Sequence, residues 1–298
     1  MSPDWLESRL GSGLLPVPSN VVDDIHARRA TSFGSVAPQY ALYRPDYPNE
    51  AVAWALALLP KDTPNNDPKD ALNDGPGDGF PRATSVGRVL DLGAGTGKLT
   101  AAIVRCGVPA AAVLAVEPDD EMRAELSRQL PEITALRGSA ERIPAEDEAV
   151  DAVLIGQAFH WFDPDRALPE IARVLRPGGV LATIGNTEDD SVGWVAELTA
   201  AIQAVRPSKA IELGFVAMPE HPAFGKPTQR RFRWRWPRTI DSLLATTSTH
   251  SWMLVCEPDE NAAVLAVIRR FLEQHPATRD AAFELPMQAL VQRLTRRF

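Results

Sequence analysis

The chain has 298 residues, of which 45% are hydrophobic, so it is long enough for one large α/β domain or for a domain with an appendage. Its formal net charge of −8 gives no general attraction to nucleic acids or to anionic membranes, so we expect neither of those partners and instead a small molecule. Two cysteines exclude a disulfide framework, and without a secretory leader or an apolar run of about eighteen residues we expect a cytoplasmic protein.

The first 85 residues are predicted to form three segments. Residues 1–24 contain glycine and proline and are predicted to be a mobile arm. Residues 25–59 are predicted to form a lid followed by a first helix over 49–59. Residues 60–85 are rich in Pro, Asp, Asn and Gly, a composition that predicts a disordered insertion because it buries too little apolar surface.

All three tyrosines of the chain, Tyr40, Tyr43 and Tyr47, lie within eight positions beside Arg44. One explanation is a hydrophobic staple that pins the chain where it enters the following helix. The other is a lid over a cofactor, in which Tyr40 and Arg44 contact the cofactor and Arg44 pairs with its carboxylate. Both explanations stay open at this point.

The most informative segment is a predicted strand, glycine-rich turn and helix at residues 86–106. Gly93, Gly95 and Gly97 permit a tight turn and a close approach of the backbone to a ligand. The dinucleotide fingerprint does not fit, because no third glycine stands three positions after the second. The Walker A motif does not fit either, because Leu99 stands where magnesium needs a hydroxyl.

Glu117 ends the next predicted strand, twenty positions after Gly97. Doubly wound folds place an acid there that accepts hydrogen bonds from ribose hydroxyls. A turn without phosphate spacing but with a ribose-binding acid suits an adenosyl ligand whose anionic end is an amino-acid carboxylate. S-adenosyl-L-methionine, with S-adenosyl-L-homocysteine as its product, is such a ligand.

At residues 91–97 the chain resembles the class I S-adenosylmethionine-dependent methyltransferases (EC 2.1.1.-), whose first motif is Asp-x-Gly-x-Gly-x-Gly. Residues 33–48 resemble the Tyr-x-x-x-Arg-Pro-x-Tyr-Pro entry of a small-molecule subgroup that includes trans-aconitate and ubiquinone/menaquinone-type methyltransferases. Leu-Arg-Pro-Gly-Gly at residues 175–179 is similar to a segment of the same family. The resemblance favours the lid.

Strand and helix patterns alternate along the predicted cofactor-binding core at residues 86–190, which argues for a parallel sheet with helices on both faces. Strands are predicted at 88–92, 112–117, 133–136, 150–155 and 179–184, and helices at 98–106, 119–130 and 165–175. We expect an α/β fold, a doubly wound and mostly parallel seven-stranded sheet that is Rossmann-like, with an N-terminal lid and a C-terminal α/β extension.

The C-terminal part, residues 191–298, is predicted to complete the sheet and to cover the acceptor pocket. It contains helical patterns at 191–204 and 259–274, and residues 285–297 resemble the last strand of the subgroup. At residues 231–236 arginine alternates with Phe and Trp, which predicts a strand. We favour a solvated arginine face over a buried aromatic face, and an anion-binding wall beside the cleft is the alternative.

Ligands of such sheets bind at the carboxyl ends of the strands. Glu117, Pro118 and Asp119 are expected to hold the ribose. Met122 either packs on adenine or is plain core. Ser139 stands where the resemblance implies an aspartate that binds the adenine amino group. The predicted cofactor-binding residues are Tyr40, Arg44, Asp91, Gly93, Ala94, Gly95, Thr96, Gly97, Glu117, Pro118, Met122, Ser139, Ala140, Glu141, Gln157, Ala158 and Phe159.

His160, in the aromatic segment 156–162, is the predicted catalytic residue. An imidazole takes a proton from a hydroxyl near neutral pH, although a histidine among aromatic rings can also be a packed, hydrogen-bonded residue. A carboxylate acceptor is already ionised and needs no base. The five histidines have no metal-ligand spacing, so no metal site is expected.

The predicted function is therefore S-adenosylmethionine-dependent methyl transfer to a small-molecule acceptor by in-line displacement, with a carboxylate or hydroxyl acceptor favoured. One alternative is a regulatory protein that binds the cofactor without turnover. The other is a nicotinamide-dependent oxidoreductase, which shares the strand, the turn and the ribose-binding acid. The oligomeric state and the choice among O-, N- and C-methylation are left open.

Overall fold

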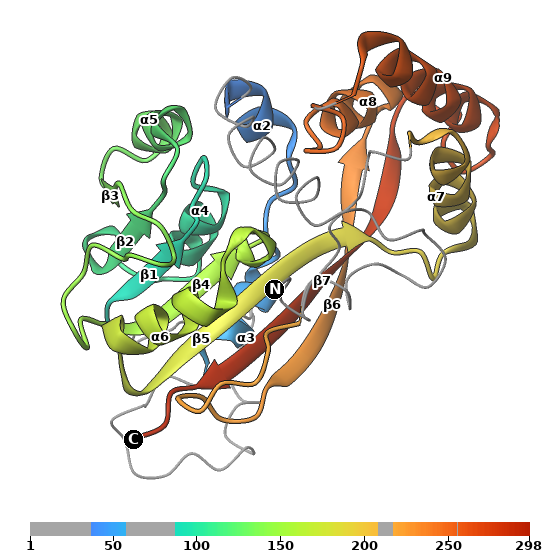
Figure 1. Ribbon diagram of the computed structural model, residues 1–298. Helices are drawn as coiled ribbons and strands as arrows, with labels where there is room; N and C mark the ends of the chain where they lie inside the picture. Colours follow the sequence, from blue (N-terminus) through green and yellow to red (C-terminus); the bar gives the residue numbers. More distant parts are fainter. Residues whose placement is uncertain (1–36, 58–86, 208–216, 255) are drawn as a thin grey trace, which may run out of the picture.

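The computed structural model describes residues 37–57, 87–207, 217–254 and 256–298. Their strands form one seven-stranded sheet in the order β3-β2-β1-β4-β5-β7-β6 (Figure 1). Strands β1 to β5 pair in parallel, and β7 pairs antiparallel with β5 and β6, so the sheet is mostly parallel, as predicted. The strands are β1 (Val89–Leu92), β2 (Val113–Val116), β3 (Thr134–Leu136), β4 (Val150–Gly156), β5 (Leu175–Glu188), β6 (Thr228–Arg238) and β7 (Phe283–Thr295). The α-helices are α2 (Ala37–Tyr43), α3 (Asn49–Leu56), α4 (Lys98–Arg105), α5 (Asp120–Gln129), α6 (Pro164–Val174), α7 (Gly193–Val205), α8 (Ile240–Ser248) and α9 (Pro258–Gln274).

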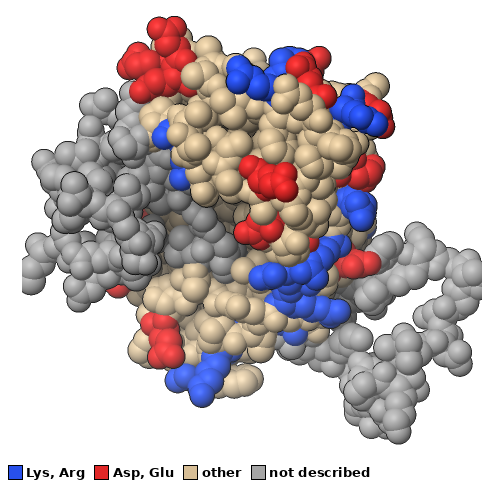
Figure 2. All heavy atoms as spheres, turned by 90° about the vertical axis from the view of Figure 1, so that its right-hand side faces the viewer, with Lys and Arg blue, Asp and Glu red and all other residues tan. Residues whose placement is uncertain are grey.

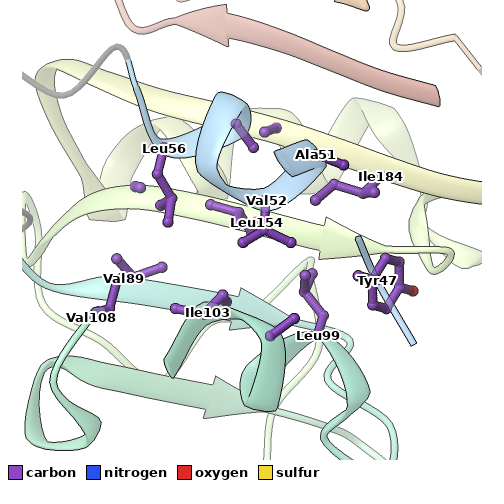
Figure 3. Close-up of a cluster of buried hydrophobic side chains, with 14 of the residues drawn as sticks. Tyr47, Ala51, Val52, Leu56, Val89, Leu99, Ile103, Val108, Leu154 and Ile184 are labelled. Atoms are coloured by element: carbon purple, nitrogen blue, oxygen red, sulfur yellow. The ribbon is translucent and has the colours of Figure 1, made fainter. Parts of the chain in front are cut away.

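Helices cover both faces of the sheet, which confirms the predicted doubly wound α/β fold. All four residues of β1 are buried, because a central parallel strand is covered on both sides. On one face, Val52 of α3 and Ile103 of α4 pack in one apolar cluster with Val89 and Leu154 of the sheet (Figure 3). Ile171 of α6 belongs to a second cluster that includes other sheet residues.

The last third of the chain adds β6 and β7 to the sheet. It also places α7 after the carboxyl end of β5 and α8 after the carboxyl end of β6 (Figure 1). Helices α7, α8 and α9 pack around a third apolar cluster that contains Leu198, Leu243, Ile268 and Leu285. We call these three helices the C-terminal lobe.

Three elements differ from their predictions. Strand β5 begins earlier, because Leu175 already pairs with Val150 of β4 ahead of a register shift. Strand β6 is longer than predicted, since it pairs with β7 along its whole length. Helix α8 is missing from the prediction, because its Thr and Ser residues have modest helix propensity; a capping box between Thr239 and Ser242 stabilises its start.

Some predictions fall outside the described residues. These are the arm at 1–24, the insertion at 60–85, and residues 25–36 and 58–59 of the lid and first helix. Within the described ranges, no helix is both long enough and apolar enough to cross a membrane. On the face shown in Figure 2, acidic and basic side chains of the described residues lie in small groups of both signs rather than in one large basic field.

Candidate active site

A pocket of about 260 Å³ lies at the carboxyl ends of β1, β2, β4 and β5. The strand order reverses between β1 and β4, and open α/β sheets form their ligand crevice at such a reversal. The predicted site residues that line the pocket are Tyr40, Arg44, Gly93, Gly95, Glu117, Pro118, Met122, Gln157, Ala158, Phe159 and His160. The sheet topology thus brings together residues from the lid, from the glycine-rich turn and from the ends of three neighbouring strands.

The glycine-rich turn forms the wall after β1. Gly93 and Gly95 line the pocket, whereas Ala94, Thr96 and Gly97 lie behind that wall. A Cβ at Gly97 would lie 2.9 Å from a side-chain carbon of α5, so this glycine permits close packing of the turn on that helix. Gly95 has a φ of +55°, and a Cβ there would meet no atom of the described residues within 4 Å. Gly95 is therefore the position at which the turn is open toward a ligand.

Glu117 joins the turn to the end of β2. Its Oε2 accepts a hydrogen bond of 2.8 Å from Gly95 N, and its Oε1 accepts one of 3.0 Å from Asp119 N. Burial raises the pKa of Glu117, and the two backbone hydrogen bonds act in the opposite direction. Asp119 caps α5 by accepting hydrogen bonds from backbone N–H groups, including that of Met122. The cap fixes Met122, which is 4% exposed, at the pocket wall.

Asp91 lies at the end of β1, behind the pocket wall. Its side chain is fully buried, and Oδ2 accepts a hydrogen bond of 2.6 Å from the Thr100 hydroxyl. Burial raises the pKa of Asp91 to about 7, against the lowering effect of that hydrogen bond. Its Oδ1 has no hydrogen-bond partner among the residues the structure describes. Asp91 therefore ties β1 to α4 and supports the turn from behind.

The segment after β4 forms the opposite wall of the pocket. Gln157 adopts a φ of +51°, which is uncommon for a residue with a side chain and costs on the order of 1–3 kcal/mol. Two hydrogen bonds to β5 hold it there, from Gln157 N to Ile184 O at 3.0 Å and from Nε2 to Asn186 O at 3.1 Å. The chain is thereby turned so that the next residues face the pocket.

His160 lies in the 3₁₀ turn Phe159–Trp161 that follows. Its ring is centred 4.7 Å from that of Trp161, and both residues line the pocket. The buried rings of Phe159 and Phe162 pack edge to face at 5.9 Å and anchor the turn. The structure therefore places His160 at the pocket wall on a turn that is held by aromatic packing.

The described part of the lid, residues 37–48, lies between the core and the C-terminal lobe, since α2 contacts both α5 and α8. Arg44 Nη2 donates a hydrogen bond of 2.9 Å to Thr249 O, and its guanidinium lies 4.9 Å from the ring centre of Tyr40. Asn186 Nδ2 donates one of 3.0 Å to Asp46 O, which fastens the lid to the end of β5. Within the described part of the chain, Arg44 Nε is buried and has no hydrogen-bond partner.

The tyrosines of the cluster lie in two different surroundings. Tyr47 is buried in the apolar cluster of Figure 3, ahead of α3, as a staple would be. Tyr40 instead lines the pocket. Tyr47 thus has the surroundings expected of a staple, whereas the cofactor contact of Tyr40 stays a prediction.

The segment at residues 139–141 lies away from the pocket wall. Ser139 forms an isolated β-bridge with Arg142. Ala140 is 2% exposed in the second apolar cluster, and Glu141 accepts a hydrogen bond of 3.0 Å from Asp163 N. These three residues make contacts outside the pocket and do not line it.

Several pocket residues are absent from the sequence-based prediction. Residues 183–188 of β5, together with Trp236, His250, Trp252 and Met287, line the pocket. Burial, and next the charge of Arg44, lowers the pKa of His250 well below its ordinary value, so this imidazole is neutral at pH 7. Apart from the aromatic alternation that includes Trp236, no local sequence signal marks these positions, because the sheet topology alone brings them to the pocket.

The arginines at positions 231, 233 and 235 of β6 lie on its exposed face. Arg231, Arg233 and Arg235 are exposed and are not part of the pocket wall, whereas Trp236 is. Arg233 Nε forms an ion pair of 2.8 Å with the buried carboxylate of Asp189. The structure thus has the solvated arginine face that we favoured.

Among the described residues there is no cluster of His, Cys, Asp and Glu able to bind a metal.

Comparison with known proteins agrees with this architecture. Residues 90–183 match the model of a methyltransferase domain family. An uncharacterised methyltransferase of Mycobacterium tuberculosis is 37% identical over 250 residues, which cover 83% of this chain and 87% of the relative. An uncharacterised methyltransferase of Schizosaccharomyces pombe is 37% identical over 59% of this chain and 60% of its own length. A solved structure from Anaeromyxobacter dehalogenans, assigned as a type II methyltransferase, has the same fold, with a TM-score of 0.58 at 20% identity, and the match covers 85% of this chain and 98% of that one. Because the mycobacterial relative is matched over most of both chains, this chain belongs to the methyltransferase family.

Proposed function

We propose that this chain transfers the methyl group of S-adenosyl-L-methionine to a small-molecule acceptor bound in the pocket. The observation that carries the proposal is the hydrogen bond of 2.8 Å from Gly95 N to Glu117 Oε2. It brings the open position of the glycine-rich turn and the acid at the end of β2 to one place beside the reversal of strand order. Doubly wound folds bind nucleosides at this place, with the acid on the ribose hydroxyls.

The pocket residues fit this cofactor. Glu117 would accept hydrogen bonds from the ribose, and Met122 would offer apolar surface to the adenine. Arg44, whose buried Nε has no partner among the described residues, would pair with the cofactor carboxylate. The space in front of Gly95, which a Cβ would enter, leaves room for the backbone to approach the ligand.

The other predicted residues have lesser roles in this proposal. Those behind the wall would support the turn without touching the cofactor: Asp91, Ala94, Thr96 and Gly97. The contribution of residues 139–141 to adenine binding stays a prediction, and so does membership of the trans-aconitate and quinone-type subgroup.

When bound, S-adenosyl-L-methionine supplies a methyl group on a positively charged sulfur, and S-adenosyl-L-homocysteine is the product. The task of the protein is to orient the acceptor, which contributes about 7–11 kcal/mol when reacting groups are held in line. For a hydroxyl acceptor, a ring nitrogen of His160 takes the hydroxyl proton. For a carboxylate acceptor no proton moves, and His160 orients the acceptor.

An oxygen acceptor is further supported by one relative. A malonyl-[acyl-carrier protein] O-methyltransferase of Methylococcus capsulatus is 40% identical over 124 residues, which are 40% of this chain and 42% of that protein. We therefore extend the proposal to an oxygen atom, of a carboxylate or a hydroxyl, as the site of methylation.

Calorimetric titration of the full chain tests the proposal. We expect S-adenosyl-L-methionine and S-adenosyl-L-homocysteine to bind and NADH not to bind. Binding of NADH alone would replace the proposal with the oxidoreductase alternative. Binding of both adenosyl ligands, with no S-adenosyl-L-homocysteine formed from S-adenosyl-L-methionine in the presence of any small carboxylic acid or phenol tested, would favour the regulatory alternative.

A further inference from the structure

A second, smaller cavity lies inside the C-terminal lobe. It has a volume of about 80 Å³, several times the roughly 10–15 Å³ that one water molecule needs. Most of its wall is apolar and comes from α7, α8, α9 and β7. The apolar residues that carry the argument are Val195, Leu198, Ile202, Leu243, Ile268 and Leu285.

This cavity adjoins the main pocket. Glu188, His250 and Trp252 line both spaces, so they form the junction between them. Charged residues that line these spaces together with His250 include Glu188, Arg44 and, on the cavity side, Arg206, whose guanidinium lies 5.9 Å from the ring centre of Trp252. Burial and the charge of Arg44 keep His250 neutral, so the junction does not place a charged imidazole beside an apolar group.

The cavity wall selects the chemistry of its occupant. Val195 and Ile268 are 1% exposed and Leu285 is fully buried, so a charged or strongly polar group entering there would lose its hydration. The polar and charged residues of this wall are Thr199 and Gln203 of α7, Arg206 after that helix, Thr247 of α8, and Glu188 and His250 at the junction. An apolar chain gains free energy in such a space by leaving water.

We propose that the cavity in the C-terminal lobe binds an apolar tail of the acceptor, whose polar, methylated end lies in the main pocket. This inference rests on the proposed function and narrows the acceptor class to amphiphiles with one oxygen-bearing end. The reaction itself is unchanged: the acceptor oxygen forms the new bond to the methyl carbon, the carbon–sulfur bond breaks, and a hydroxyl proton goes to His160.

The test is a binding series with ligands that differ only in chain length. The full chain, saturated with S-adenosyl-L-homocysteine, is titrated calorimetrically with phenol and with 4-n-alkylphenols from methyl to octyl, and in parallel with n-alkanoic acids. Each buried methylene should tighten binding about fourfold until the cavity is full, after which the affinity should level off. A Kd that does not depend on chain length would overturn the proposal.

Two neighbouring positions of α7 supply the variants. Thr199→Phe places a ring in the cavity and should abolish the dependence on chain length, whereas Thr199→Ala should keep it. Ala200→Phe is the matched control, since Ala200 is exposed on the same helix and does not line the cavity. Thr199→Leu serves as a smaller plug if the phenylalanine variant unfolds. Persistence of the full dependence in the plugged variant would also overturn the proposal.

The design separates this inference from the proposed function. Failure of S-adenosyl-L-homocysteine to bind the native chain counts against the proposed function alone. The same alkyl series is then run without it, and a chain-length dependence that Thr199→Phe removes would show that the cavity binds apolar tails. Absence of that dependence, with S-adenosyl-L-homocysteine bound normally, would leave the methyltransferase proposal standing and reject the tail site.

Discussion

Replacing Gly95 by alanine tests whether a ligand approaches the backbone at the open position of the glycine-rich turn. In the folded chain the added Cβ meets no atom of the described residues within 4 Å, so the cost to folding arises from the φ of +55°. An L-residue in the left-handed region costs about 1–2 kcal/mol. The lower entropy of the unfolded chain offsets about 0.4–1 kcal/mol of this. We therefore expect Gly95→Ala to lower the free energy of unfolding by about 1 kcal/mol.

Gly95→Ala should make the free energy of ligand binding less favourable by more than it lowers the free energy of unfolding. If the cofactor packs against Gly95, the extra methyl group overfills a close-packed contact at a cost of about 1–3 kcal/mol. Such a cost weakens binding by about 5- to 150-fold. Calorimetric titration with S-adenosyl-L-homocysteine measures the affinity, and urea unfolding of the same samples measures the stability.

Gly107→Ala is the matched control. Gly107 has a φ of +95°, and a Cβ there also meets no described atom within 4 Å, but the residue is exposed and does not line the pocket. It should lose a similar amount of stability and keep its affinity for S-adenosyl-L-homocysteine. The reasoning is refuted if Gly95→Ala binds this ligand as tightly as the native chain, or if both variants lose affinity equally.

Three further predictions concern acidic and imidazole groups of the site. Glu117→Gln should weaken binding of S-adenosyl-L-homocysteine by about 10- to 150-fold in calorimetry, because hydrogen bonds to a charged group are worth about 1.5–3 kcal/mol; an unchanged Kd would contradict the ribose role. His160→Ala should leave that Kd within about twofold and slow methylation of a hydroxyl acceptor by about 10²- to 10⁴-fold, with no such loss for a carboxylate acceptor, as followed by release of S-adenosyl-L-homocysteine. Asp91→Asn should remove a pH dependence of stability. In the folded chain the pKa of Asp91 is raised to about 7, so the folded chain keeps a proton that the unfolded chain loses near pH 4. The contribution of Asp91 to the free energy of unfolding therefore falls as the pH rises toward 7 and is constant above pH 7. Urea unfolding between pH 5 and 7 should show a fall of about 2–3 kcal/mol in the native chain relative to the variant, and parallel profiles would count against the raised pKa.

The core of the fold could be predicted because its signals are local. Alternating apolar runs and helix patterns define β1 to β5 and the helices between them, since a parallel strand buried on both faces needs a continuous apolar run. The glycine-rich turn and Glu117 could be paired from spacing alone, because the turn, one helix and the next strand make up one supersecondary unit of nearly constant length. From these features, most of the predicted site residues could be assigned to the edge of the sheet where the parallel strands have their carboxyl ends.

Only the tertiary structure decided the remaining features, because these features depend on contacts between residues far apart in the chain. The insertion of β7 between β5 and β6, and the position of Trp236, His250 and Trp252 at the pocket, follow from antiparallel pairing that no local pattern encodes. Burial, which is a property of the packed chain, placed Asp91 behind the turn, and tertiary contacts hold Ala140 in the second apolar cluster and Glu141 at Asp163. The amino-acid sequence by itself thus determined the side of the pocket that is built on the glycine-rich turn and Glu117, whereas packing of the C-terminal lobe against the sheet determined the shape of the other side.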